Sequence, residues 1–84
     1  MEIKNSLDWQ QVSMELRKSI AKSGHPMDLN KMMFNLENMV GELSRLEVTA
    51  RRTHNNIQTN EQLVKINKSI QYLEKMMLMS MLMK

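Results

Sequence analysis

Apolar residues recur at helical spacing through residues 27–54, and this pattern constrains the fold more than any other feature of the chain. With successive residues 100° apart, as in an α-helix, most of them fall within one broad arc. An arc of this width has to be covered by other apolar groups, so the pattern predicts a long core-facing helix in an all-α protein. The residues of the arc are Leu29, Met32, Met33, Leu36, Met39, Val40, Leu43, Leu46 and Ala50.

A second and thinner apolar line lies nearly opposite this arc, at strict seven-residue spacing. It consists of Met27, Phe34, Gly41 and Val48. Glycine inside a helix costs about 1 kcal/mol relative to alanine, so Gly41 favours the close approach of another backbone. The alternative is a tolerated glycine placed by chance. Because a helix that is apolar on two sides needs neighbours on both, we predict that Phe34, Gly41 and Val48 belong to an interface.

A shorter helix is predicted before this one, at about residues 6–23. Asn5 or Ser6 can cap its start, and Gly24 offers a left-handed cap at its end, followed by Pro26, which cannot continue the helix. The short loop after it predicts that the first two helices fold back on one another. The residues that share the apolar face of the first helix are Trp9, Val12, Leu16 and Ile20.

The heptad phase of the second helix breaks between Ile57 and Leu63. The break coincides with a possible capping box, formed by Thr59 and Gln62 three residues later. We therefore predict a turn near residues 55–59. One continuous helix with a stutter is the alternative.

These elements predict a single helical domain over residues 1–84, with helices at about 6–23, 27–54 and 60–83. The last two form a long antiparallel hairpin, and the first packs against one side of it. We also expect a frayed segment at residues 1–4 and a surface pair between Glu47 and Arg51, four residues apart.

The 84 residues include no cysteine, so neither a disulfide nor a Cys-based zinc site can supplement the core. A domain of this size buries roughly 60 to 65% of its unfolded surface, and its stability is modest. We therefore expect the core to be completed by oligomerisation or by a partner.

After Lys75 the apolar residues spread around the whole circumference of the third helix. A helix that is hydrophobic all round needs burial on all sides. Methionine, with 11 copies in the chain, is unbranched and adapts to different partners, although a loosely specified core would also use it. We predict that this end binds a partner through Met76, Met77, Leu78, Met79, Met81, Leu82 and Met83.

The sequence offers little for catalysis or metal binding. Thioethers suit Cu(I), but no histidine supports the methionines near the end, so packing is the favoured role. His25 and His54 lie at predicted helix ends without a second ligand at suitable spacing. No glycine-rich phosphate loop occurs, and we interpret the carboxylates as a solvated flank. We expect no enzymatic activity, no cofactor and no metal; the carboxylates in question are Glu37, Glu42 and Glu47.

The net charge of +3 is spread along the chain rather than clustered. Only Arg51, Arg52 and His54 gather, at a helix end that favours positive charge in any case. Nucleic-acid binding is therefore disfavoured, although a small basic helical regulator is an alternative.

Membrane association is also disfavoured by the sequence. The longest apolar run, residues 76–83, falls short of the roughly 20 residues that a spanning helix needs. Peripheral contact remains an alternative, because Lys65, Lys68 and Lys75 lie opposite an apolar face. No secretory signal fits the first residues, so we expect a cytoplasmic protein; export without a cleaved signal would look the same.

The outline of a Trp-bearing first helix, a short Pro-containing turn and a long helix resembles the needle and inner-rod subunits of type III secretion systems. The resemblance covers roughly half the chain. The turn near residue 57 and the Met-rich third helix depart from that plan. Helical-hairpin co-chaperones of the same systems are similar in shape. The matching positions are Trp9, Val12, Ser13, Pro26, Leu29, Leu36, Met39, Arg51 and Arg52.

Taken together, these features predict a non-enzymatic helical module for protein–protein interaction or assembly. Its surplus apolar helix faces and its Met-rich end would be buried against a protein partner or against other copies of the chain. A secretion-needle or inner-rod subunit, a helical co-chaperone and a nucleic-acid-binding regulator are the alternatives.

Overall fold

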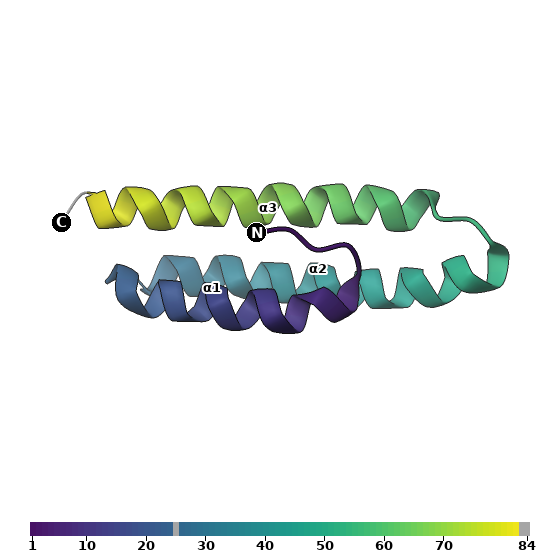
Figure 1. Cartoon of the computed structure of the whole chain (residues 1–84), viewed down its shortest axis with the longest axis horizontal. Coiled ribbons are helices and arrows are strands. Elements are labelled where there is room, and N and C mark those ends of the chain that lie inside the picture. The colour runs from purple at the N-terminus through teal and green to yellow at the C-terminus, as the bar shows by residue number, and fades with distance from the viewer. Residues whose placement is uncertain (25, 83–84) are drawn as a thin grey trace.

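The computed structural model describes residues 1–24 and 26–82, and these residues form helices and no strand (Figure 1). A single 3-10 turn, η1 (Ser6–Asp8), leads into α1 (Trp9–Ser23). Two long helices follow, α2 (Pro26–Thr53) and α3 (Ile57–Leu82). The predicted all-α fold of three helices is confirmed.

The two long helices pack side by side as an antiparallel hairpin, and α1 packs against both of them (Figure 1). The molecule is elongated, with extents of 50 × 17 × 16 Å. At 1.5 Å per residue, the 15 residues of α1 span little more than half the length of the 28-residue α2. The turn end of the hairpin therefore extends beyond α1.

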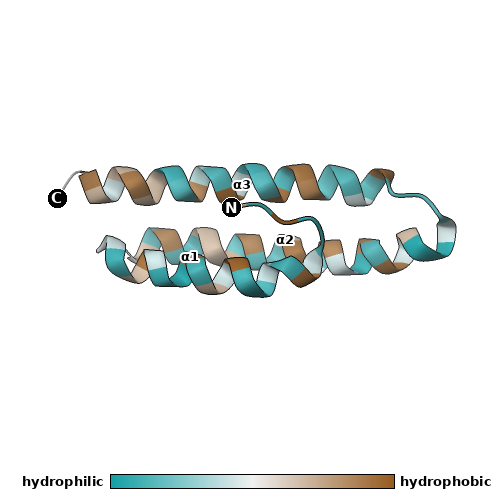
Figure 2. Ribbon diagram, viewed as in Figure 1, coloured by the Kyte–Doolittle hydropathy of each residue, from teal (hydrophilic) through white to brown (hydrophobic). Residues whose placement is uncertain are grey.

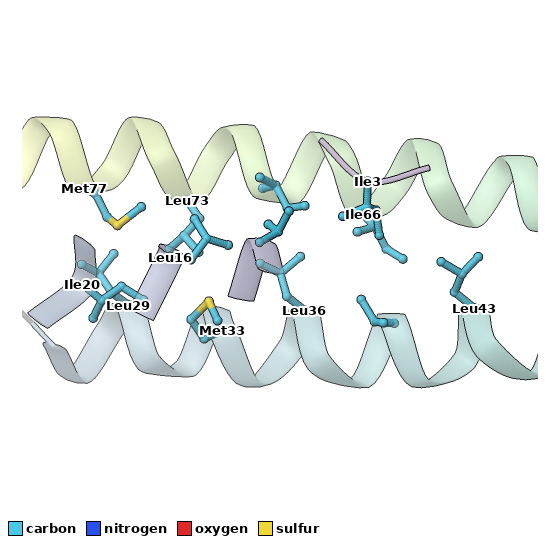
Figure 3. Packing of buried hydrophobic residues seen from close by; sticks show 13 residues of the cluster. Ile3, Leu16, Ile20, Leu29, Met33, Leu36, Leu43, Ile66, Leu73 and Met77 are labelled. Atoms are coloured by element: carbon cyan, nitrogen blue, oxygen red, sulfur yellow. The ribbon is translucent and has the colours of Figure 1, made fainter. Parts of the chain in front are cut away.

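The core lies along the seam where the three helices meet (Figure 3). The predicted apolar arc of α2 faces this seam, with Met32 and Met39 at its partly buried edge. On α1 the predicted face is also buried, and Trp9 packs at its margin. The apolar residues buried in the seam are Ile3, Val12, Leu16, Ile20, Leu29, Met33, Leu36, Val40, Leu43, Ile66, Ile70, Leu73 and Met77.

The caps at both ends of the first helical segment match the sequence. The Asn5 side chain accepts a hydrogen bond from the backbone N–H of Asp8, at 3.2 Å. Gly24 ends α1 in the left-handed conformation, with φ of 80°. Glycine meets this requirement without the steric cost that a Cβ would add.

The break between α2 and α3 is confirmed, but it lies earlier than predicted. His54 adopts a φ of 54°, and α3 begins at Ile57 rather than at residue 60. The side chain of Asn55 accepts a hydrogen bond from the Ile57 N–H at 3.0 Å, so this asparagine satisfies an amide at the helix start. The predicted box of Thr59 and Gln62 is wrong, because Gln62 instead donates across the hairpin to the carbonyl oxygen of Met39 (3.0 Å).

The prediction of a frayed segment at residues 1–4 is also wrong. Ile3 is 1% exposed and belongs to the core. Its N–H donates to the Oδ1 of Asn67 at 2.8 Å, and its carbonyl accepts from the Nδ2 of the same amide at 2.9 Å. The amino group of Met1 pairs with Glu74 at 3.1 Å. Residues 1–5, called the N-terminal arm below, are therefore held against α3 by hydrogen bonds and an ion pair.

Two carboxylates of α2 hold other elements in place instead of forming a solvated flank. Glu47 accepts hydrogen bonds from the backbone N–H (2.8 Å) and the hydroxyl of Ser6, rather than pairing with the predicted Arg51. Glu37 forms an ion pair with Arg17 of α1. The expectation was wrong for these two carboxylates because their partners, Ser6 and Arg17, are 41 and 20 residues away, and helical periodicity does not reveal which polar side chains meet once the helices pack.

Candidate interaction surface

The last turns of α3 carry a group of exposed apolar side chains, named here the Met-rich end. The exposed fractions are 58% for Leu78, 45% for Met79, 55% for Met81 and 76% for Leu82. Figure 2 shows hydrophobic colours concentrated at this end of α3. On α3, these four residues are the part of the predicted interface that the structure leaves open to solvent.

Other residues predicted for the same interface lie elsewhere. Met77 is 5% exposed and sits in the core, above Ile20 and Leu29 (Figure 3). Met76 is half-buried against the core. Met83, like His25, lies outside the described residues. Among residues 1–24 and 26–82, other segments therefore cover only one side of the last turns of α3.

The thin apolar line of α2 is also at the surface. Met27 is 74% exposed, Phe34 63% and Val48 46%. A Cβ added at Gly41 would meet nothing within 4 Å. No other segment of the described chain packs closely on this glycine, so its predicted role in close packing depends on a partner.

The other two helices carry similar exposed lines. On the first helical segment, Leu7 and Met14 are seven residues apart and exposed. On α3, Ile57 and Val64 are seven apart and exposed, and Leu78 continues the series after Gln71. The line on α3 was not predicted, because Ile57 was placed in the predicted turn at residues 55–59, whereas α3 begins at this residue. Seven-residue spacing would have revealed the line once the helix start was known.

A shallow hollow of about 350 Å³ lies between α2 and α3. Its apolar lining comes chiefly from methionines of α2 and from Tyr72, which is 58% exposed. The sequence predicted that Met32 and Met39 face the core, and no periodic signal joins them to Tyr72 on the other helix. The lining residues are Met32, Asn35, Leu36, Met39, Lys68, Ser69 and Tyr72.

The hollow opens on the side of the hairpin that faces away from α1 and the N-terminal arm. Steps of 100° place Glu37, which holds α1, on the opposite flank of α2 from Asn35. The same steps place Asn67, which holds the arm, on the opposite flank of α3 from Tyr72. This side of the hairpin, named here the open face, is uncovered by any other described element.

The described residues contain few groups suited to other chemistry. No three His, Cys, Asp or Glu side chains among them lie close enough together to hold a metal ion. Arg51, Arg52 and His54 are exposed at the turn end of the hairpin. Within residues 26–82 neither long helix is apolar enough over its length to span a bilayer.

Fold and surface together define a small all-α protein in which three helices share one core and leave apolar side chains exposed. Comparison of the chain with protein-family models, curated proteins and solved structures finds no match. The resemblance to secretion-needle subunits therefore stays a prediction from the sequence.

Proposed function

We propose that this protein is a non-enzymatic helical interaction module that buries its Met-rich end against a protein partner or against another copy of the chain. The observation that carries the proposal is the exposure of Leu78, Met79, Met81 and Leu82 on consecutive turns of one helix. A helix with apolar residues on every side is stable in water only where other groups cover it.

Burial of the exposed residues of the Met-rich end would contribute a substantial free energy to association. Burying one Leu or Met side chain contributes roughly 1.5 to 3 kcal/mol, so the four exposed residues offer several kcal/mol before the costs of association are deducted. Methionine side chains adjust to irregular surfaces at little energetic cost. The Met-rich end therefore suits a partner surface that is itself an apolar helix or groove.

The carboxylates of α2 support a structural role over a catalytic one. Glu37 is paired with Arg17, and Glu47 accepts two hydrogen bonds from Ser6. Both groups thus hold α1 and its leading turn on the hairpin. We assign no catalytic residue.

Substitution at the Met-rich end tests the proposal. Leu82→Glu and Met79→Glu place a charge on exposed positions, so helicity should stay nearly unchanged while association weakens at least tenfold, because burying an unpaired charge is costly. Gln71→Glu, also exposed on α3, is the matched control. The measurement is sedimentation velocity of the labelled chain, alone over a concentration series and in cell extract.

The expected result is a particle larger than one chain for the parent and the control, and a smaller particle for the two variants. Should the parent sediment as a single chain both alone and in extract, or should the variants behave like the parent, the proposed function is wrong.

A further inference from the structure

We propose that the open face of the hairpin is covered by a second copy of this chain, related by a twofold axis parallel to the helices, so that two hairpins form a four-helix bundle. This inference rests on the proposed function and specifies its partner. The centre of the face is the hollow lined by Met32, Met39 and Tyr72. The charged groups around it are mainly acidic on α2, where Lys31 is the exception, and mainly basic on α3, where Glu61 is the exception.

The acidic groups border the face on α2. Asp28, Asn35 and Glu42 follow one another at seven-residue spacing, and Asn35 lines the hollow. Spacing of seven keeps side chains on one line of a helix, so the two carboxylates flank the hollow along α2. Both are exposed, and neither forms an ion pair within the described residues.

The basic groups border the same face on α3. Lys65 precedes Tyr72 by seven residues, and Lys68 lines the hollow beside Tyr72. Lys75 follows Lys68 by seven and lies on the same line. All three lysines are exposed, and none is ion-paired within residues 1–24 and 26–82.

Glu42 of α2 and Lys65 of α3 lie at matching heights along the hairpin. Asn35 and Tyr72 line one hollow, so they are level with each other. Glu42 lies seven residues from Asn35 along α2, and Lys65 lies seven residues from Tyr72 along α3. Both steps lead toward the turn of the hairpin. In the other direction Asp28 lies one heptad from Asn35, with Lys75 about one turn beyond Tyr72.

This arrangement decides between the two ways of placing one hairpin on another. A twofold axis perpendicular to the helices would set α3 on α3 and bring lysines against lysines. An axis parallel to the helices sets α2 of one copy on α3 of the other at the same height. Glu42 then faces Lys65 of the second copy, and each such pair occurs twice.

The resulting bundle has a familiar architecture. Each of its four helices would be antiparallel to both neighbours, as in up-and-down four-helix bundles. Methionines and Tyr72 of both copies would fill the new interior, while α1 stays on the outside. Both Met-rich ends would lie at the same end of the assembly, where Met79, seven residues beyond Tyr72 on the same line of α3, is covered by the second copy.

Charge exchange between Glu42 and Lys65 tests the inference by sedimentation equilibrium of the full chain. The parent should reach twice the single-chain mass of 9.9 kDa. Glu42→Lys and Lys65→Glu should each weaken the dimer about tenfold, since two pairs become repulsive in each case. The double variant should return to within about threefold of the parent. Glu15→Lys, on the outward α1, is the control and should leave the dimer unchanged; circular dichroism checks that each variant is folded.

A parent that remains a single chain at every concentration overturns the inference, as does a double variant that stays as weak as the single ones. Failure here is distinguishable from failure of the proposed function. If the isolated chain is a single subunit but sediments faster in extract, the second copy is the wrong occupant and the module still binds a partner. If it is a single chain in both, both proposals are wrong.

Discussion

The N-terminal arm and the Met-rich end show opposite relations between composition and burial. The arm is mostly polar, yet its Ile3 is 1% exposed and both backbone polar groups of Ile3 are paired with Asn67. The Met-rich end is mostly apolar, yet Leu82 is 76% exposed. The two segments lie against or within the same helix, α3 (Figure 1).

The difference teaches that burial depends on the neighbours available, and hydrophobicity alone does not determine it. Ile3 reaches the groove beside Ile66, where α3 also offers the amide of Asn67 (Figure 3). The last turns of α3 meet the start of α2 and the end of α1 on one side only. The chain therefore buries one apolar residue of a polar segment and leaves several of an apolar segment in water.

Of the substitutions that test this contrast, truncation of Ile3 should have the largest effect on the free energy of unfolding. Ile3→Ala removes a fully buried side chain and should lower the free energy of unfolding by about 2 to 4 kcal/mol. Leu82→Ala removes a similar volume from an exposed site and should change the free energy of unfolding by less than about 0.5 kcal/mol. Urea denaturation followed by circular dichroism, at a concentration where the chain is unassociated, measures both.

The contrast between the two segments would be refuted if Ile3→Ala and Leu82→Ala changed the free energy of unfolding by the same amount. Equal and small losses would mean that the arm is not fastened to α3 in solution. Equal and large losses would mean that the Met-rich end packs within its own chain.

A smaller effect of opposite sign is expected at Gly41. Gly41→Ala should raise the free energy of unfolding by about 0.5 to 1 kcal/mol, because alanine favours the helix and an added Cβ meets nothing within 4 Å. If a partner backbone approaches this glycine, the same variant should associate more weakly than the parent. Thermal unfolding and sedimentation of Gly41→Ala separate the two effects, and a destabilised single chain would contradict the structure.

Periodicity was sufficient to predict the helices and most of their buried faces. Most of the long apolar arc of α2 and the predicted face of α1, with Val12, Leu16 and Ile20, recur at helical spacing and lie in the core. Local caps were also predictable where one residue type has a clear mechanism, as at Asn5 and Gly24. These signals are local, so one sequence contains them.

The roles that the sequence analysis missed depend on residues far apart in the chain. Asn67 pairs with Ile3 across 64 positions, and Glu47 holds Ser6 across 41. Nothing near Ile3 distinguishes a bound arm from a frayed one. The hollow on the open face was missed for the same reason, since Asn35 and Tyr72 become neighbours only when the hairpin closes.

Methionine oxidation tests the central claim most directly, because it reports on single residues. Sulfoxide formation by dilute hydrogen peroxide, read by mass spectrometry, should be fast at Met79 and Met81 and slow at Met33 and Met77 in the dilute chain, following their exposure. Under conditions of association, Met79 and Met81 should become slow, because a partner or second copy covers them. Slow oxidation of Met79 and Met81 in the dilute chain, or unchanged fast oxidation in the associated particle, would contradict the account.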